Sequence, residues 1–425
     1  MKPSPPLGQR GVAALGVTLM LLFAMTLMVG IANRNLVFEQ RSSANQIRAT
    51  RAFEAAEAGL EWAQAMLTSG STIGDDCAPS AAAGSTSFRE RVLDYDAASR
   101  RFSPKTWTAA GASHPLQAAC VLADAGWTCG CPSAGHPTLT EPAEAGAHPA
   151  FAVLFIAATR AGMVQAVVTG CDHFAPACLP GLAGSSAGRA SATSQVTLAL
   201  LPALATPPVA ALTARGNLAA VGALTLVNTD AASGGLTAQA GGSIAMPAAS
   251  LVTIGERPGA ASLAAGDAQL TATDAERLLT RFLGLDRAHW QQRPGVRSVT
   301  CTDECGASLA DAIGPDSAHR MLWVAGELQL DGPFTLGSPD RPVILVVEGP
   351  LRLGSGVVIH GLVVSLAANW DTSGSAGAQL HGALIALGGV SGNGALTIAY
   401  DPAVLARLGG ELGSFVRVPG SWRDF

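Results

Sequence analysis

The sequence is poor in charge and in aromatic side chains. Charged residues make up 13% of its 425 residues, aromatic residues 5%, and the net charge is −5. Basic residues do not cluster anywhere along the chain. Because nucleic-acid binding draws on clustered Lys and Arg side chains, this composition argues against a nucleic-acid partner.

The sequence also lacks common motifs that position catalytic groups. It contains no phosphate-binding P-loop, no HExxH zinc motif and no dinucleotide fingerprint. The closest acidic pairs are Asp75-Asp76, Asp94-x-Asp96 and Asp303-Glu304. They lie in loop-like stretches, where solvated turn residues are a simpler reading than Ca²⁺ ligands or a glycosidase acid–base pair. We therefore expect no enzymatic activity, no cofactor and no metal.

A long apolar run near the amino terminus is the most informative stretch. Residues 12–32, VAALGVTLMLLFAMTLMVGIA, carry no charge and are long enough to cross a bilayer. The run continues without a proline into an amphipathic segment, where apolar residues recur at steps of four and three: Phe53, Ala56, Leu60, Ala63 and Leu67. This spacing predicts a helix that packs lengthwise on another element. We expect one continuous helix over residues 12–68, with its first half in a membrane.

Two short motifs flank the apolar run. Gln9-Arg10-Gly11 precedes it and AFEAAEAGL, residues 52–60, follows it. Together they resemble the amino-terminal segment of PilX-type minor pilins of type IV pili. The resemblance implies that residues 1–11 are a leader, that a prepilin peptidase cleaves after Gly11, that Val12 becomes N-methylated, and that the helix is buried in a filament core.

The resemblance also implies partners and a location. The partners are other major and minor pilins, the prepilin peptidase, the inner membrane and a host-cell or surface ligand. Lys2 and Arg10 precede the apolar run, so the short amino-terminal end should stay cytoplasmic. The chain is thus expected as a single-pass inner-membrane protein with its carboxy-terminal part in the periplasm, and later on the pilus or cell surface.

One position departs from the major-pilin pattern. Major pilins carry a Glu at the fifth residue after the cleavage site, where this chain has Gly16. In the family this Glu neutralises the terminal ammonium of a neighbour within an apolar core, where an unpaired charge is costly. PilX-type minor pilins lack the Glu, as does the K-type minor pseudopilin of type II secretion. Gly16 therefore indicates a low-copy subunit and leaves both systems open.

The cysteines favour an oxidising compartment. There are eight: Cys77, Cys120, Cys129, Cys131, Cys171, Cys178, Cys301 and Cys305. An even number behind a membrane segment favours disulfides over free thiols. Cys171 with Cys178, and Cys301 with Cys305, are close enough to close local loops, whereas the pairing of the first four cannot be read. Zinc is the competing reading, although no spacing matches a strong zinc motif.

Residues 69–202 are expected to form a disulfide-tied, β-rich head. Residues 69–149 are rich in Gly, Pro and Ser, which indicates irregular structure. Three later runs, residues 151–160, 162–171 and 191–202, are typical of antiparallel strands, the first two forming a hairpin. Such strands would cover the apolar stripe of the helix.

The segment Pro202–Pro208 marks a boundary, and residues 209–425 are expected to form a Gly-rich, β-solenoid-like region. HGLV at 360–363 returns as HGAL at 381–384, an offset of 21 residues, with alternating apolar positions around it. A repeat of this length suits coils that stack on one another. His360 and His381 would then lie in adjacent coils, as a polar stack or, alternatively, a shared metal site. A helical insertion is expected at about 273–285, with Thr273 as its N-cap.

The expected fold is therefore α+β: a long pilin-type helix on an antiparallel head, followed by the solenoid-like region. The expected function is that of a minor pilin in pilus assembly and surface or cell adhesion. A K-like minor pseudopilin of type II secretion is an alternative. A membrane-anchored β-helix enzyme that acts on polysaccharide is an alternative of another class, which the scarcity of acids in the repeats disfavours.

Overall fold

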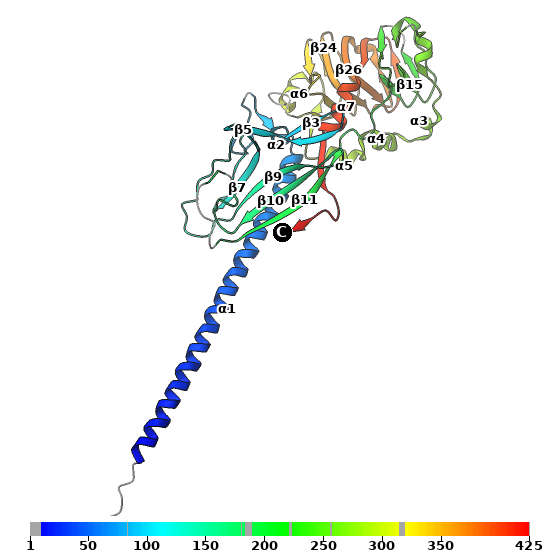
Figure 1. Ribbon diagram of the computed structural model, residues 1–425. Coiled ribbons are helices and arrows are strands. Elements are labelled where there is room, and N and C mark those ends of the chain that lie inside the picture. The colour runs from blue at the N-terminus through cyan, green and yellow to red at the C-terminus, as the bar shows by residue number, and fades with distance from the viewer. Residues whose placement is uncertain are drawn as a thin grey trace, which may run out of the picture.

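The structure is a computed structural model that describes residues 10–82, 84–179, 181–182, 189–220, 223–255, 257–313 and 319–424. A long helical rod leads into a head of antiparallel strands, and a second β-rich region lies beyond the head (Figure 1). The predicted α+β class with a long amino-terminal helix is confirmed. Residues 1–9, most of the predicted leader, lie outside the described residues.

The rod is helix α1 (Arg10–Thr68), which runs for 59 residues without interruption. At 1.5 Å per residue it is roughly 90 Å long. No proline occurs in it, so every residue can continue the backbone ladder. Its last third lies along the head, and the rest extends away from it (Figure 1).

The head is built on a sheet whose strands run in the order β29-β11-β10-β9-β7-β8, with β30 also paired to β11. These strands are β7 (Gln117–Ala123), β8 (Gly126–Gly130), β9 (Ala150–Ala157), β10 (Met163–Cys171), β11 (Ser191–Pro202), β29 (Gly413–Arg417) and β30 (Arg423–Asp424). Their ladders are antiparallel. The predicted hairpin of residues 151–171 is present, and α1 covers one face of the sheet.

Short elements fill the stretch that was expected to be irregular. They are β1 (Thr72–Ile73), β2 (Thr86–Ser87), α2 (Phe88–Val92), β3 (Leu93–Asp96), β4 (Arg101–Pro104), β5 (Thr106–Ala109) and β6 (Ala112–Pro115). A capping box between Ser87 and Glu90 starts α2. The expectation missed β7 and β8. Six consecutive apolar residues, Ala118 to Ala123, occupy β7, so alternation does not reveal it.

The boundary of the second region needs a correction. Residues 209–425 were expected as one carboxy-terminal region, but β29 and β30 return to the head and pair with β11. The physical reason is that β11 would otherwise leave a row of unpaired backbone groups at the sheet edge. The second region therefore ends where β29 begins.

The second region consists of parallel ladders. Its strands are β12 (Leu212–Ala214), β13 (Leu218–Ala220), β14 (Leu224–Val227), β15 (Ala238–Ala240), β16 (Leu251–Val252), β17 (Leu263–Ala264), β18 (Val296–Cys301), β19 (Met321–Gly326), β20 (Leu328–Leu330), β21 (Phe334–Leu336), β22 (Val343–Val347), β23 (Leu351–Leu353), β24 (Val357–Ser365), β25 (Asn369–Asp371), β26 (Ala376–Ala386), β27 (Gly389–Gly392) and β28 (Ala395–Tyr400). The longest sheet has the order β16-β14-β28-β26-β24-β22-β19-β18. His360 pairs in register with His381, as the 21-residue offset predicts.

Helices pack against these ladders, most of them over one side. They are α3 (Ala268–Ala272), α4 (Ala275–Leu283), α5 (Arg287–Gln291), α6 (Gly306–Ile313) and α7 (Pro402–Glu411), with short 3₁₀ turns at 248–250, 259–262 and 372–374. Of these, α6 contributes Leu309 and Ile313 to the core inside the turns. The expected helical insertion is present as α4, and it ends at Gly284 in the left-handed conformation. Its expected cap was wrong: Asp274, not Thr273, accepts the amide of Arg277. A carboxylate is the stronger cap here because it also carries charge at the helix start.

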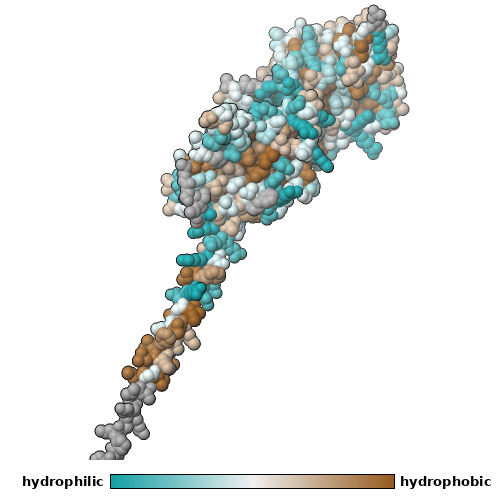
Figure 2. Space-filling model, viewed as in Figure 1, coloured by the Kyte–Doolittle hydropathy of each residue, from teal (hydrophilic) through white to brown (hydrophobic). Residues whose placement is uncertain are grey.

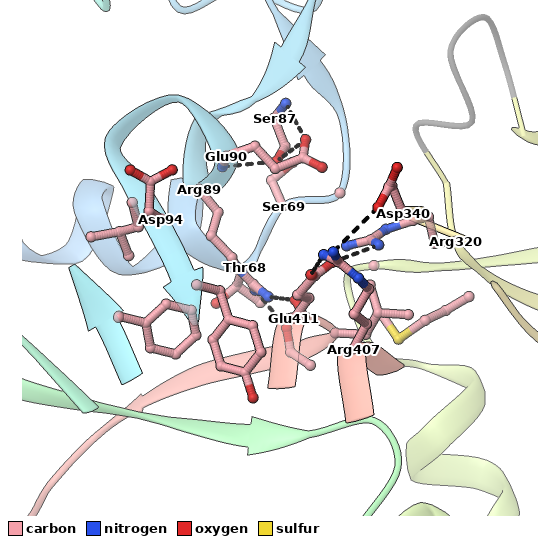
Figure 3. A pocket seen from close by; sticks show the side chains of 18 of the residues that line it. Thr68, Ser69, Ser87, Arg89, Glu90, Asp94, Arg320, Asp340, Arg407 and Glu411 are labelled. Atoms are coloured by element: carbon pink, nitrogen blue, oxygen red, sulfur yellow. Dashed lines mark hydrogen bonds and ion pairs between the residues drawn. The ribbon is translucent and has the colours of Figure 1, made fainter. Parts of the chain in front are cut away.

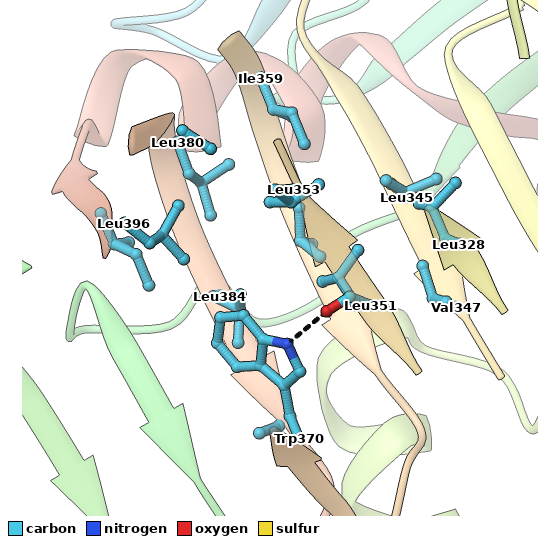
Figure 4. Close-up of a cluster of buried hydrophobic side chains, with 14 of the residues drawn as sticks. Leu328, Leu345, Val347, Leu351, Leu353, Ile359, Trp370, Leu380, Leu384 and Leu396 are labelled. Carbon is cyan, nitrogen blue, oxygen red and sulfur yellow. Dashed lines mark hydrogen bonds between the residues drawn. The ribbon is translucent and has the colours of Figure 1, made fainter. Parts of the chain in front are cut away.

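Two apolar cores stabilise the second region. One lies inside the stacked turns and includes Leu345, Leu380 and Leu396; within it, the indole NH of Trp370 donates to Leu351 O at 2.9 Å (Figure 4). The other lies between the parallel strands and the covering helices, and it includes Trp290 and Trp323. Both tryptophans are fully buried and their rings lie 5.9 Å apart.

Candidate functional site

The exposed part of α1 carries most of the large hydrophobic side chains that the described residues expose. Every side chain from Ala14 to Arg51 is exposed. Among the described residues, α1 alone is long and apolar enough to cross a membrane, and the apolar window is not buried by any other part of the chain. Figure 2 shows brown, hydrophobic side chains along this rod. Water is a poor environment for such a surface, so a bilayer or other apolar helices must cover it.

The other end of α1 is held on the head by alanine and leucine side chains. Leu60, Ala56, Ala63 and Leu67 are fully buried against the sheet. Phe53, also in the predicted stripe, is half-buried and its ring meets the edge of Trp422 at 6.2 Å. Four residues of the predicted apolar stripe are thus buried on the head, and the fifth, Phe53, contacts the carboxy-terminal segment.

Two glycines allow the helix and the sheet to touch. A Cβ on Gly59 would lie 2.6 Å from Val168 Cγ1, and a Cβ on Gly170 would lie 2.2 Å from Ala52 O. Real Cβ atoms do not approach other atoms so closely, so larger residues would push α1 off β10. Sequence reasoning missed Gly170, because its importance depends on which strand lies under the helix.

The carboxy-terminal segment also contacts α1. Arg417 forms an ion pair with Glu61 at 2.9 Å and a hydrogen bond to Gln64 at 3.1 Å. The indole NH of Trp422 donates to Glu57 at 2.9 Å. Spaced along about two turns of the helix, these contacts fix the rod at a defined angle to the head.

The predicted processing residues lie at the far end of the rod. Gly11 and Val12 belong to the first turns of α1, although their side chains lie outside the described part of the chain. Gly16 lies in the exposed segment with open space around it. The structure places these residues far from the head and from every cysteine (Figure 1).

A charged cavity of about 270 Å³ lies where α1 ends, between the head and the second region. In Figure 3, Arg320 and Arg407 converge on Glu411, and Arg407 also reaches Asp340. The Glu411 carboxylate lies 2.9 Å from each guanidinium. Because acids and bases alternate around this cavity, its charges are neutralised internally.

Arg89 is the central head residue of this cavity. Its guanidinium donates to Leu67 O at 2.8 Å, to Gly413 O at 2.7 Å and to the carbonyl of Glu411. Burial, reinforced by the nearby Arg320, lowers the pKa of Arg89 to about 10, so it remains charged at neutral pH. Leu67 O lies at the carboxy-terminal end of α1, where a cation is favourable. Arg89 thus joins the helix, the head and the second region.

The neighbouring Glu90 pairs with Arg341 of the second region at 3.3 Å. Burial acts to raise the pKa of Glu90, but Arg341, Arg320 and the hydrogen bonds from Ser87 outweigh it, and the pKa lies below its usual value. The carboxylate is therefore charged at neutral pH and can hold Arg341.

The cysteines form four disulfides, so the prediction of disulfides is confirmed. Cys171 is joined to Cys178 and Cys301 to Cys305, the two pairs that close local loops. The pairs that the sequence left open are Cys77–Cys131 and Cys120–Cys129. The second of these links paired residues of β7 and β8.

The remaining predicted polar sites have structural roles. The rings of His360 and His381 stack 4.9 Å apart. Among the acidic pairs, Asp75 pairs with Arg91 at 2.7 Å, Asp94 with Lys105 at 3.3 Å, and Glu304 accepts the amide of Gly306. Within the described ranges, no three His, Cys, Asp or Glu side chains converge as metal ligands would.

Comparison with known protein families confirms the resemblance of the amino-terminal segment to PilX-type proteins. Residues 10–61 match the family described as PilX N-terminal. No curated protein matches the chain. A solved structure that resembles it is the competence-associated pilin ComZ from Thermus thermophilus, at 12% identity and a TM-score of 0.21, with 89% of this chain and 97% of that chain covered. The family match covers the exposed part of α1 and about half of the part that lies on the head.

Proposed function

Because the chain carries a PilX-type amino-terminal segment, we propose that it is a minor pilin that takes part in the assembly of a type IV pilus. The observation that carries this proposal is the exposed apolar part of α1. An apolar rod that continues without a break into a helix clamped on a head can leave a bilayer and pack among other such rods. Its proposed partners are the major and minor pilins of that filament, and its role is structural.

We propose further that a prepilin peptidase removes residues 1–11 and that Val12 becomes the N-methylated terminus. Before assembly the chain would cross the inner membrane once, with the head in the periplasm. Afterwards it would belong to the pilus at the cell surface. Gly16 supports a low-copy position, since it offers no carboxylate to a neighbouring terminal ammonium.

The second region is proposed to be a β-solenoid that faces outward and binds a host-cell or surface ligand. Its support is the parallel pairing of successive turns, for example β24 with β26 and β26 with β28. It is also the part of the molecule that lies farthest from the exposed rod (Figure 1).

Mass spectrometry of the mature protein tests the processing step. The expected product begins at Val12 and carries one additional methyl group. Gly11→Leu should retain the leader, because the bulky side chain would not fit at the cleavage point, whereas Gly30→Leu, farther along the apolar run, should be processed. A wild-type chain that still begins at Met1 would exclude the proposed maturation.

Shearing of surface filaments tests the location. The mature protein should appear in the sheared fraction together with the major pilin. If it instead stays in the inner membrane with components of type II secretion, the K-like pseudopilin is the correct assignment, since Gly16 fits both.

A further inference from the structure

The polypeptide leaves and re-enters the head at the same point. Strand β11 ends at Pro202 and its neighbour β29 begins at Gly413, and these two residues face each other in an antiparallel ladder. One step farther, the amide of Ala203 donates to Leu412 O at 2.8 Å. The backbone of residues 203–412 therefore begins and ends between two hydrogen-bonded neighbours.

We infer that residues 203–412 are a self-contained module inserted into one β-hairpin of the pilin head, and that the head folds and assembles without it. The part of this inference that concerns assembly rests on the proposed function. The head in this sense comprises residues 12–202 and 413–424, which supply α1 and every strand of the antiparallel sheet.

The apolar cores divide at the same two points. The core under α1 draws its buried residues from the head, including Leu60, Phe151 and Phe415, and none of its described members lies between 203 and 412. The two large cores of the second region draw all their described members from within that range. Since burial of apolar surface is the main stabilising term, each part contains what it needs to fold.

The disulfides follow the same division. Cys77–Cys131, Cys120–Cys129 and Cys171–Cys178 lie wholly in the head, and Cys301–Cys305 lies wholly in the module. No disulfide among them crosses the junction, so neither part depends on the other for its covalent links.

Several contacts between the two parts are polar. Arg89 donates to the carbonyl of Glu411, Glu90 pairs with Arg341, and Arg293 donates to Pro202 O at 3.1 Å. The charged cavity lies among these contacts. Removal of the module would leave Arg89 with two of its three carbonyls, those of Leu67 and Gly413. Polar groups uncovered in this way can be hydrated, unlike a bisected apolar core.

This arrangement separates two tasks. The surface proposed for filament packing lies on α1 and the head, whereas the module joins the chain at the ends of two adjacent strands, far from the exposed rod (Figure 1). A module of different sequence could occupy the same hairpin without disturbing the helix, provided that its own ends lie close together.

The test replaces residues 203–412 by Asn-Gly, which forms the two-residue turn that an antiparallel pair such as Pro202 and Gly413 accepts. The shortened chain should accumulate, form its three head disulfides, and be recovered in sheared filaments without loss relative to the full-length chain. Degradation of the shortened chain, or loss of its head disulfides, would overturn the inference.

A much smaller deletion provides the matched control. Removal of residues 413–425 keeps the whole module but deletes β29 and the contacts of Arg417 and Trp422 with α1. This chain should lose head folding and filament recovery, although far fewer residues are missing. If it behaves as well as the chain that lacks 203–412, β29 is not part of the head unit and the inference fails.

The result separates this inference from the proposed function. If the full-length and shortened chains both fold with native disulfides but neither enters filaments, the pilin assignment fails and the insertion stands. If the full-length chain enters filaments and the shortened chain does not, the pilin assignment stands and the insertion inference is overturned.

Discussion

The head and the inserted region cover their apolar surfaces in opposite ways. The head has an antiparallel sheet with one face against α1, so its core lies between two different elements. The inserted region has parallel turns that enclose a core of their own, with a second core beneath its helices. In the head, strand neighbours are mostly consecutive along the chain. In the inserted region, many strands pair in parallel with the next turn, and β12, β13 and β14 pair with β26, β27 and β28 from far along the chain.

This difference shows where each part is vulnerable. The head depends on close contact between a helix and a sheet, whereas the inserted region depends on the close approach of successive turns. The two parts should therefore respond to different substitutions and unfold in separate transitions. Hydrogen exchange of peptides from β10 and β24 in the detergent-solubilised full-length protein reports on each part separately.

The largest effect is expected from Gly170→Val in the head. A side chain here would collide with the backbone of α1 at Ala52 O, 2.2 Å from the Cβ position. Neither backbone can move without opening the core, so we expect a loss of more than about 4 kcal/mol in head stability. Exchange in β10 should rise while exchange in β24 stays unchanged. Gln165→Ala, on the other face of β10, is the control, and equal effects of both variants would contradict the proposed contact.

The counterpart in the inserted region is Gly382→Ala. Gly382 has φ +140°, and a Cβ there would lie 1.9 Å from Gly361 O in the adjacent turn. We expect a loss of about 3 kcal/mol or more, confined to the inserted region. Exchange in β24 should rise while β10 stays protected, with Gln379→Ala on the exposed face of β26 as the control. A rise in both strands would show that the two parts unfold as one.

The sequence predicted the features that depend on local pattern. The unbroken helix, the hairpin at 151–171, the end of α4 at Gly284 and the pairing of His360 with His381 all follow from spacing within a few tens of residues. Each uses periodicity or a turn residue that is visible in a short window.

The features that could not be predicted from the sequence depend on contacts between distant segments. GSFVR, residues 413–417, is too short to reveal that it completes a sheet begun before residue 202. The three carbonyls around Arg89 come from α1 and from both sides of the junction at residue 413, so no sequence window contains them together. The clamped stripe was visible, but the need for glycine at 170 was not, because it depends on the strand beneath Ala52.

Arg89→Met should weaken the link between the two parts. The substitution keeps a long apolar side chain but removes the donors to Leu67, Glu411 and Gly413, leaving carbonyls without partners in a buried place. We expect about 2 kcal/mol of destabilisation, felt first in β29 and in α7 on the other side of the junction. Arg101→Met, on the exposed surface of β4, should cost little, and an equal cost would mean that Arg89 contributes only apolar contact.

The smallest expected effect is a difference in pH dependence. Partial burial, and then the charge of His381, lower the pKa of His360 below its ordinary value of 6.5, against the opposing effect of Asp401. In the head, a hydrogen bond with the Glu144 carbonyl raises the pKa of His148 above 6.5. These shifts have opposite signs, so acidification should affect the two parts differently.

The signs follow from proton binding. Between its lowered pKa and 6.5, His360 binds fewer protons in the folded than in the unfolded state, so the inserted region should lose stability as the pH falls below about 6.5. His148 binds more protons when folded, so its contribution is present at low pH and is lost as the pH rises through its folded pKa. In thermal unfolding, a change from pH 7.5 to 5.5 should therefore lower the transition temperature of the inserted region and raise that of the head. His360→Gln should reduce the change of transition temperature with pH in the inserted region alone. His148→Gln should reduce it in the head alone. Parallel shifts of both transitions in either variant would show that these histidines do not report on separate folding units.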